Sequence, residues 1–211
     1  MQPIPENARP GDPRWALAFL DLAQGLVIAG AKAKLIERFT DLPRSKIKEL
    51  YKALRGTSPP AGPVMQGSAR YFAVPGKHTS EAARIQCVIF LACYQRMAKI
   101  TSTPMQRGWL LLAAFNSYLS ITETLSPTDA IKRLDINQAY ALLAYCGFMT
   151  MLNGAELQLR QCQICSISYP VVAAEALDLQ CCPVCAIDDN CERLSDQAPL
   201  ARRGGRRSKS G

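Results

Sequence analysis

The sequence contains a single histidine, His78, among its 211 residues. An isolated histidine is more often an exposed polar residue or a helix cap than a ligand, and we assign it no role. The expected helices have no paired carboxylates placed for acid–base chemistry, no glycine-rich phosphate loop and no Ser/His/Asp set. We therefore predict that the chain is not an enzyme.

Long apolar runs are also missing. No uninterrupted run approaches the roughly 20 residues needed to cross a bilayer. Residues 1–11 hold three prolines and a glycine but no apolar signal-peptide core, so we expect a flexible tail over residues 1–12. The nine cysteines are an odd and mostly scattered set, which favours a reducing compartment over a disulfide framework. These features predict a cytoplasmic protein that does not contact a membrane.

What the chain does have is apolar content and positive charge. Apolar residues make up 48% of it, enough for a buried core, and its length allows one ordinary domain with a small appendage. The formal net charge is +8. In an ordered protein, an excess of positive charge indicates a nucleic acid as the binding partner, and less often an anionic membrane surface.

Two Cys-x-x-Cys pairs lie near the C-terminal end: Cys162 with Cys165, and Cys182 with Cys185. Each two-residue spacer lets a tight turn aim both sulfurs at one point, and four thiolates suit a tetrahedral Zn²⁺. Because all four ligands would be cysteines, the zinc ion would have no coordination position open to a substrate. We therefore predict one structural zinc ion per chain.

Other interpretations of these cysteines remain open. Free cysteines in the core are one, and a redox dithiol is another, although it explains only one of the two pairs. Cys181 adjoins Cys182 and can compete with it as a ligand. We prefer Cys182, because its spacing to Cys185 repeats that of the first pair.

The N-terminal part predicts a helical hairpin. A very apolar helix begins at Asp12-Pro13 and needs partners on more than one side, in a core or in a subunit interface. Within residues 29–56 we expect a helix over Ala31–Arg38, a turn over Phe39–Leu42 and a helix over Arg44–Leu54. The last helix has apolar residues at i, i+3, i+4 and i+7: Ile47, Leu50, Tyr51 and Leu54.

The opposite face of this helix is basic and polar. It carries Arg44, Ser45, Lys46, Lys48, Lys52 and Arg55. Two short helices with a basic outer face are what a helix-turn-helix needs, since N-terminal residues can reach base edges while lysines meet phosphates. An ordinary solvated amphipathic helix is the alternative.

The segment Lys46–Gly56 followed by Ser58-Pro59-Pro60 resembles the corresponding stretch of FlhC, the bacterial flagellar transcriptional activator subunit. The Gly30-Ala31-Lys32 segment before it and the terminal four-cysteine arrangement occur in the same order as in that family. The resemblance is specific over residues 26–60 and 157–185. It implies a mostly helical protein with zinc on Cys162, Cys165, Cys182 and Cys185. It also implies a hetero-oligomer with FlhD that binds promoter DNA and activates flagellar operons through RNA polymerase.

The remaining segments predict a packed helical core and a small C-terminal module. We expect a loop or hinge over residues 57–78, with an extended piece at Ala69–Val74. Helices follow over residues 79–98 and 103–125, and an almost wholly apolar one over Ile136–Leu152. Alternation at residues 157–160 and the run Tyr169–Val172 predict two short strands beside the cysteine turns.

The predicted fold class is therefore mainly α. It comprises a helical domain over residues 13–156 with the helix-turn-helix-like segment 29–56, a zinc-ribbon-like module over residues 157–190 and a basic disordered tail over residues 191–211. The predicted function is a DNA-binding activator subunit. The alternative is a zinc-stabilised scaffold or interaction protein whose basic face reads no sequence.

Overall fold

Helices form most of the structure, and a two-stranded antiparallel sheet completes it. The computed structural model describes residues 13–64, 68–74, 80–98, 103–125, 133–149, 155–172 and 180–187. The expected tails (residues 1–12 and 191–211) and His78 lie outside these ranges. The mainly α fold class is confirmed. Within the described ranges, no helix has the length and apolarity to span a bilayer.

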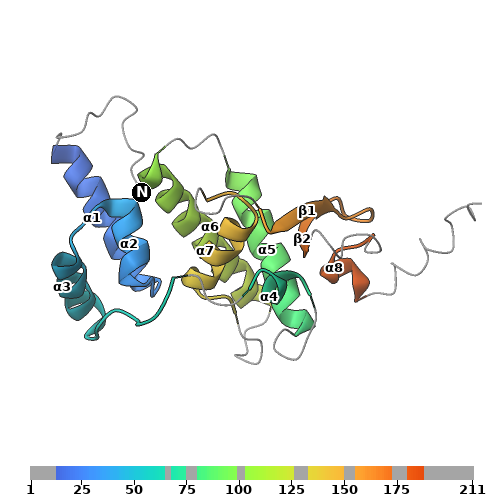
Figure 1. Cartoon of the computed structure of the whole chain (residues 1–211), viewed down its shortest axis with the longest axis horizontal. Helices are drawn as coiled ribbons and strands as arrows, with labels where there is room; N and C mark the ends of the chain where they lie inside the picture. Colours follow the sequence, from blue (N-terminus) through green and yellow to red (C-terminus); the bar gives the residue numbers. More distant parts are fainter. Residues whose placement is uncertain are drawn as a thin grey trace, which may run out of the picture.

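Three helices make up one end of the elongated molecule, drawn in blue shades in Figure 1. They are α1 (Pro13–Ile28), α2 (Ala33–Thr40) and α3 (Arg44–Arg55), and each packs against the other two. The predicted hairpin is confirmed, with its first helix shifted by two residues. Because α1 covers the inner side of both α2 and α3, only the outer side of the hairpin faces solvent.

The middle of the molecule consists of α4 (Arg70–Ala73), α5 (Glu81–Met97), α6 (Pro104–Leu125) and α7 (Ile136–Tyr145). The start of α7 is a capping box: Asp135 accepts from the Gln138 N–H, and the Gln138 side chain accepts from the Asp135 N–H. Every residue of α7 except Gln138 is buried. Packing against α5 and α6 thus makes α7 the centre of the core.

Two sequence predictions in this region are wrong. The helix from Ile136 ends at Tyr145 rather than at Leu152, because Gly147 adopts a left-handed φ of +79°. The N–H of Gly147 then bonds to Ala144 and that of Phe148 to Leu143, which is a Schellman ending. The segment predicted to be extended forms the single helical turn α4, whose Phe72 is buried in the core.

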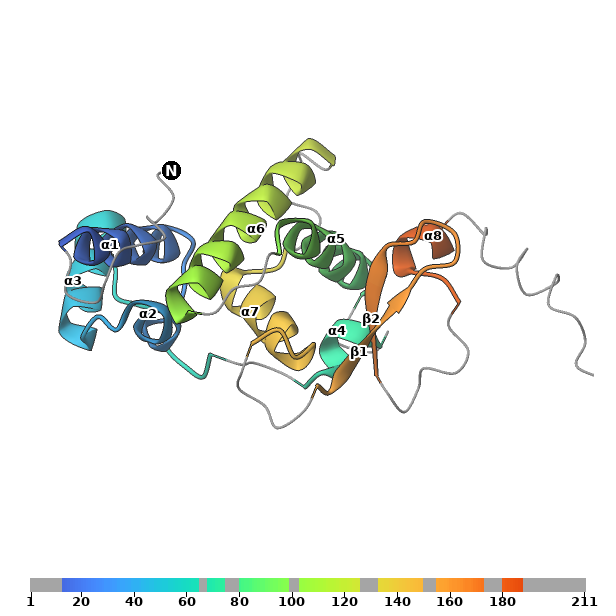
Figure 2. The same ribbon diagram turned by 90° about the horizontal axis from the view of Figure 1, so that it is seen from above.

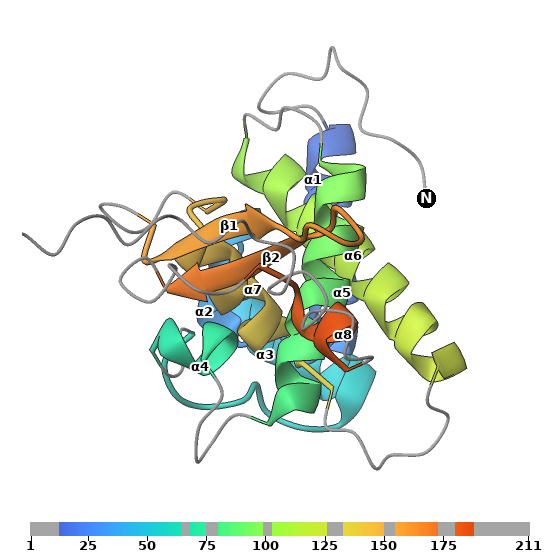
Figure 3. The ribbon, with the colours of Figure 1, turned by 90° about the vertical axis from the view of Figure 1, so that its right-hand side faces the viewer.

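The C-terminal module lies at the other end of the molecule (Figure 2). Strands β1 (Leu157–Gln161) and β2 (Ser168–Val172) pair antiparallel, and the short helix α8 (Pro183–Ala186) follows. Viewed from this end, the sheet and α8 lie in front of α5 and α7 (Figure 3). Both predicted strands are confirmed, whereas α8 occupies a place where we expected only a turn.

Two glycines allow the N-terminal helices to approach the core closely. A Cβ atom on Gly108 of α6 would lie 2.9 Å from both Leu22 of α1 and Phe39 of α2. A Cβ on Gly25 of α1 would clash with Leu112 of α6. The absence of side chains at these positions therefore sets the distance between α6 and the three N-terminal helices α1–α3, which we call the hairpin unit.

We predict that Gly108→Ala lowers the free energy of unfolding by about 1–3 kcal/mol, because a well-packed crossing resists an added methyl group. The sign is diagnostic, since Gly→Ala inside a helix otherwise stabilises by roughly 0.5–1 kcal/mol. Urea titration measures the change. Asn116→Ala on the exposed face of the same helix is the control and should change stability by no more than about 0.5 kcal/mol. A more stable Gly108→Ala protein would contradict the close crossing.

Candidate nucleic-acid interface and metal centre

The turn between α2 and α3 has the geometry of a tight helical hairpin. Asp41 ends α2 in the left-handed conformation, with φ +52°, and its N–H donates to the Glu37 carbonyl at 3.0 Å. Aspartate tolerates this conformation better than most residues. Thr40 closes the turn: its hydroxyl donates to the Ile36 carbonyl (2.7 Å) and accepts from the Leu42 N–H (3.4 Å). The reversal therefore needs only the three residues Asp41–Pro43.

Helix α3 is anchored by Ile47 and Tyr51, both of which are buried. The Tyr51 hydroxyl donates to the Ala31 carbonyl. Burial raises the pKa of Tyr51 to about 12, against a lowering effect of Arg55. Leu54 was expected to point inward, but it is 43% exposed. The inner face is thus narrower than the periodicity predicts.

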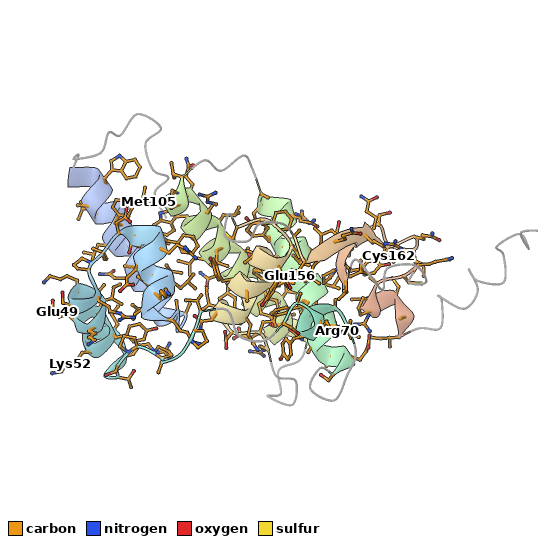
Figure 4. The ribbon with its side chains drawn as sticks, in the orientation of Figure 1. Glu49, Lys52, Arg70, Met105, Glu156 and Cys162 are labelled. Carbon is orange, nitrogen blue, oxygen red and sulfur yellow. The ribbon has the colours of Figure 1, made fainter. Side chains whose placement is uncertain are left out.

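The predicted DNA-contacting residues all lie on the exposed surface of α3: Arg44, Ser45, Lys46, Lys48, Lys52 and Arg55. Figure 4 shows Lys52 and Glu49 on the outer side of α3, at the end of the molecule opposite to Cys162. The hairpin therefore presents a basic surface that no described element covers.

Three of these cations already have partners. The Arg44 Nε lies 3.3 Å from Glu37, and the Lys46 Nζ lies 2.8 Å from Glu49, whose hydrogen bond raises the pKa of Lys46. Arg55 instead caps α1. Its Nη1 donates to the carbonyls of Ile28 (2.9 Å) and Val27 (3.3 Å). This role of Arg55 has no signal in the local sequence pattern, because the end of α1 lies 27 residues earlier in the chain.

Lys48 and Lys52 differ from these three cations in having no such partner. Within the described ranges, neither ammonium takes part in an ion pair or a hydrogen bond. Both are exposed and lie one helical turn apart on α3. They are the cations of this face that remain available for an external anion.

At the other end of the molecule, the structure brings the two Cys-x-x-Cys pairs together. One sulfur from each of Cys162, Cys165, Cys182 and Cys185 lies within 4.8 Å of the other three. The first pair sits on the turn between β1 and β2, and the second sits around the start of α8. This group of sulfurs can hold a metal ion.

Backbone hydrogen bonds shape both turns. The Cys162 N–H donates to Ile167 (3.0 Å), and the Ser166 N–H returns to the Cys162 carbonyl (2.9 Å) with Ser166 at φ +60°. At the second turn, the Ala186 N–H donates to the Cys182 carbonyl (3.1 Å). Pro183 at the first helical position needs no N–H partner there. The two-residue spacers therefore adopt compact turns that aim their sulfurs inward.

The four-cysteine group favours a thiolate at one position. Burial pushes the pKa of Cys162 upward, but hydrogen bonds from the N–H groups of Cys165, Cys182 and Ile164 lower it to about 6. Thiolates are the form of cysteine that binds metals. Burial raises the pKa of the Cys182 and Cys185 thiols within the group, as it does for Cys87 and Cys146 outside it.

Cys181, the alternative ligand, is not part of the four-sulfur group. It is buried and disulfide-bonded. The four sulfurs that the structure brings together thus include Cys182 and not Cys181. Cys87 and Cys93 of α5 are free, buried cysteines, as expected for small apolar residues.

The four-cysteine module packs against α5. Val88 of α5 is buried together with Tyr169 and Val171 of β2 and with the cysteines at positions 162, 181 and 182. Helix α5 in turn packs along α6 and α7. A structural change at the sulfur group therefore acts directly on a helix of the main core.

Comparison with known proteins connects these features to one family. Residues 18–196 match the family described as "Flagellar transcriptional activator (FlhC)". The flagellar transcriptional regulator FlhC of Cupriavidus necator is 27% identical over 210 residues, covering 96% of this chain and 92% of that protein. Regulators with the same description from Variovorax paradoxus and Enterobacter cloacae are 26% and 25% identical, over 79% of this chain and 73% and 78% of theirs.

The class is therefore that of transcriptional regulators, and the match covers most of the chain. The chain belongs to the FlhC family of flagellar transcriptional activators. The resemblance inferred from residues 26–60 and 157–185 is confirmed at the level of the family.

We predict about one metal ion per chain in protein purified without chelator, measured by elemental analysis. Cys162→Ser should lose most of this metal and lower the stability of the core, because the module packs on α5. Cys146→Ser removes a free cysteine outside the group and serves as the control. Full metal content in the Cys162→Ser/Cys165→Ser double variant would refute the proposed ligands.

Proposed function

We propose that this protein is the DNA-binding subunit of a hetero-oligomeric activator that acts with an FlhD-like partner on flagellar promoters. The complex recruits RNA polymerase in the cytoplasm and has no membrane contact. The observation that carries this proposal is the α2–α3 hairpin, because its buried side is anchored and its exposed side is basic. In such hairpins the second helix enters the major groove.

The N-terminal turn of α3 is the part placed to reach base edges. Ser45 and Lys46 are exposed there, and Lys48 and Lys52 follow along the helix toward its C-terminal end. In this arrangement the two lysines meet phosphates on the rim of the groove, whereas Arg44 and Arg55 mainly hold the helices in place. The proposal thus divides the basic residues into positioning and DNA-contacting groups.

Zinc is the metal that we propose for Cys162, Cys165, Cys182 and Cys185. A tetrahedral ion with Zn–S bonds of about 2.3 Å separates its sulfurs by roughly 3.8 Å. The sulfurs of Cys165 and Cys182 lie 3.7 Å apart. Four thiolates leave no position for water, so the ion supports the fold and supplies no catalytic chemistry.

Exposed apolar side chains on α1 support the proposal of a partner subunit. Leu17 and Ile28 are 62% and 65% exposed, and Leu20 lies between them on the same side of the helix. Exposed large apolar side chains that share one side of a helix, here with Asp21 and Gln24 among them, are typical of interfaces. We propose that the FlhD-like subunit covers this stripe, in agreement with the very apolar composition of α1.

A gel shift on a flagellar promoter fragment tests the function as a whole. We expect specific binding when the chain is co-expressed with its FlhD-like partner, and weak binding to random duplex at the same salt concentration. Equal binding to both duplexes would instead favour the alternative, a zinc-stabilised basic scaffold without sequence readout.

We predict that Lys48→Ala/Lys52→Ala lowers promoter affinity and reduces the slope of log K against log salt by about one for each lost phosphate contact. Fluorescence anisotropy at several salt concentrations measures both quantities. The charge-matched control Arg96→Ala/Arg160→Ala changes residues of α5 and β1, outside the hairpin. If both double variants lost the same affinity, net charge alone rather than α3 would explain binding.

A further inference from the structure

A pocket of about 360 Å³ lies where the hairpin unit meets the core. It is bordered by the end of α1, the start of α2, the end of α3 and the start of α7. Its volume is at the lower end of the range for small-ligand sites. The polar residues that line it are Lys32, Tyr51, Arg55, Thr57, Ser58, Asp135 and Asn137.

Lys32 is the unusual residue of this pocket, because only 6% of its surface is exposed. Its Nζ donates to the Pro63 carbonyl at 2.7 Å, and its backbone N–H donates to the Asn137 side chain at 2.8 Å. Among the described residues, no carboxylate forms an ion pair with its ammonium. A buried charge normally has a counter-charge, since burial without one is costly.

The other charges of the pocket do not balance Lys32. Arg55 adds a second cation, and its Nη1 is bonded to neutral carbonyls of α1. Asp135 is the one carboxylate among the lining residues, and one of its oxygens already accepts the N–H groups of Asn137 and Gln138. The lining therefore has a net positive charge. Thr57 and Ser58 also line the pocket, and their hydroxyls can donate further hydrogen bonds.

We propose that this pocket is a phosphate-binding site, in which Lys32 and Arg55 supply the charge and Thr57 and Ser58 supply hydrogen bonds. The bound anion provides the counter-charge that the buried ammonium lacks. Lysine, arginine and hydroxyl groups are the side chains that commonly bind phosphate. The site is separate from the exposed lysines of α3 and from the four cysteines.

The phosphate can come from two sources. One is a free phosphorylated small molecule, and the other is the backbone of DNA held against α3, which rests on the proposed function. Since the start of α2 borders the pocket, a phosphate there would lie beside the first helix of the hairpin. In helix-turn-helix proteins, this first helix crosses the DNA backbone.

The first experiment measures thermal unfolding of the metal-loaded full chain in sodium phosphate and in sodium chloride at equal ionic strength and pH. At a phosphate concentration of 100 times Kd, we expect Tm to rise by roughly 5–10 °C. Lys32→Met, which keeps the length of the side chain, should lose this rise. Lys34→Met should keep it, since Lys34 is exposed on α2 and does not line the pocket.

Thr57→Val/Ser58→Ala provides a second test in case Lys32→Met fails to fold. Both residues lie on an exposed segment after α3, and the double variant should show a reduced phosphate-dependent rise. An equal rise in wild type and Lys32→Met, or no rise in wild type, would overturn the proposal.

A titration with promoter DNA distinguishes the two sources. If the pocket holds a DNA phosphate, inorganic phosphate should compete with DNA, and Lys32→Met should reduce the salt slope by about one. If it holds a free ligand, phosphate should bind the DNA complex equally well, and the slope should stay unchanged. The thermal shift needs no DNA, so a failure of the proposed DNA binding would not affect its outcome.

Discussion

The crossing of α6 over α1 and α2 is the constraint on which the rest of the arrangement depends. Gly25 and Gly108 remove the side chains that would hold these helices apart, and Leu22, Phe39 and Leu112 fill the space. Because α6 also packs along α5 and α7, the position of the hairpin unit is set by the main core. The main core therefore also sets where the exposed face of α3 lies.

Hydrogen bonds between distant segments also join the N-terminal helices to α7. Buried Asn137 accepts from the Lys32 N–H (2.8 Å) and donates to the Gly30 carbonyl (3.2 Å), so it joins the α1–α2 connection to α7. Arg38 donates to the Tyr140 hydroxyl at 2.8 Å. All three hydrogen bonds bridge more than 100 residues of sequence, and they connect polar groups that helix formation alone leaves unsatisfied.

The sequence predicts those features that depend on local pattern. Helical spacing identifies α6 and the start of α7, and the cysteine spacing identifies the four-sulfur group. The end of α7 was missed because Gly147 is surrounded by apolar residues that continue the helical pattern. Its left-handed φ is what stops the helix.

Features that depend on tertiary contacts were beyond the reach of the sequence. The left-handed turn at Asp41 and the capping of α1 by Arg55 each require knowledge of how the helices meet. The pocket is a clear case, since Lys32 and Asn137 come from segments that only the fold brings together. Arg55 caps α1 and also lines this pocket, so the hairpin's basic residues serve different roles that their shared charge does not reveal. A basic helical face therefore indicates DNA contact only through the cations that make no interaction within the fold. On α3 these cations are Lys48 and Lys52.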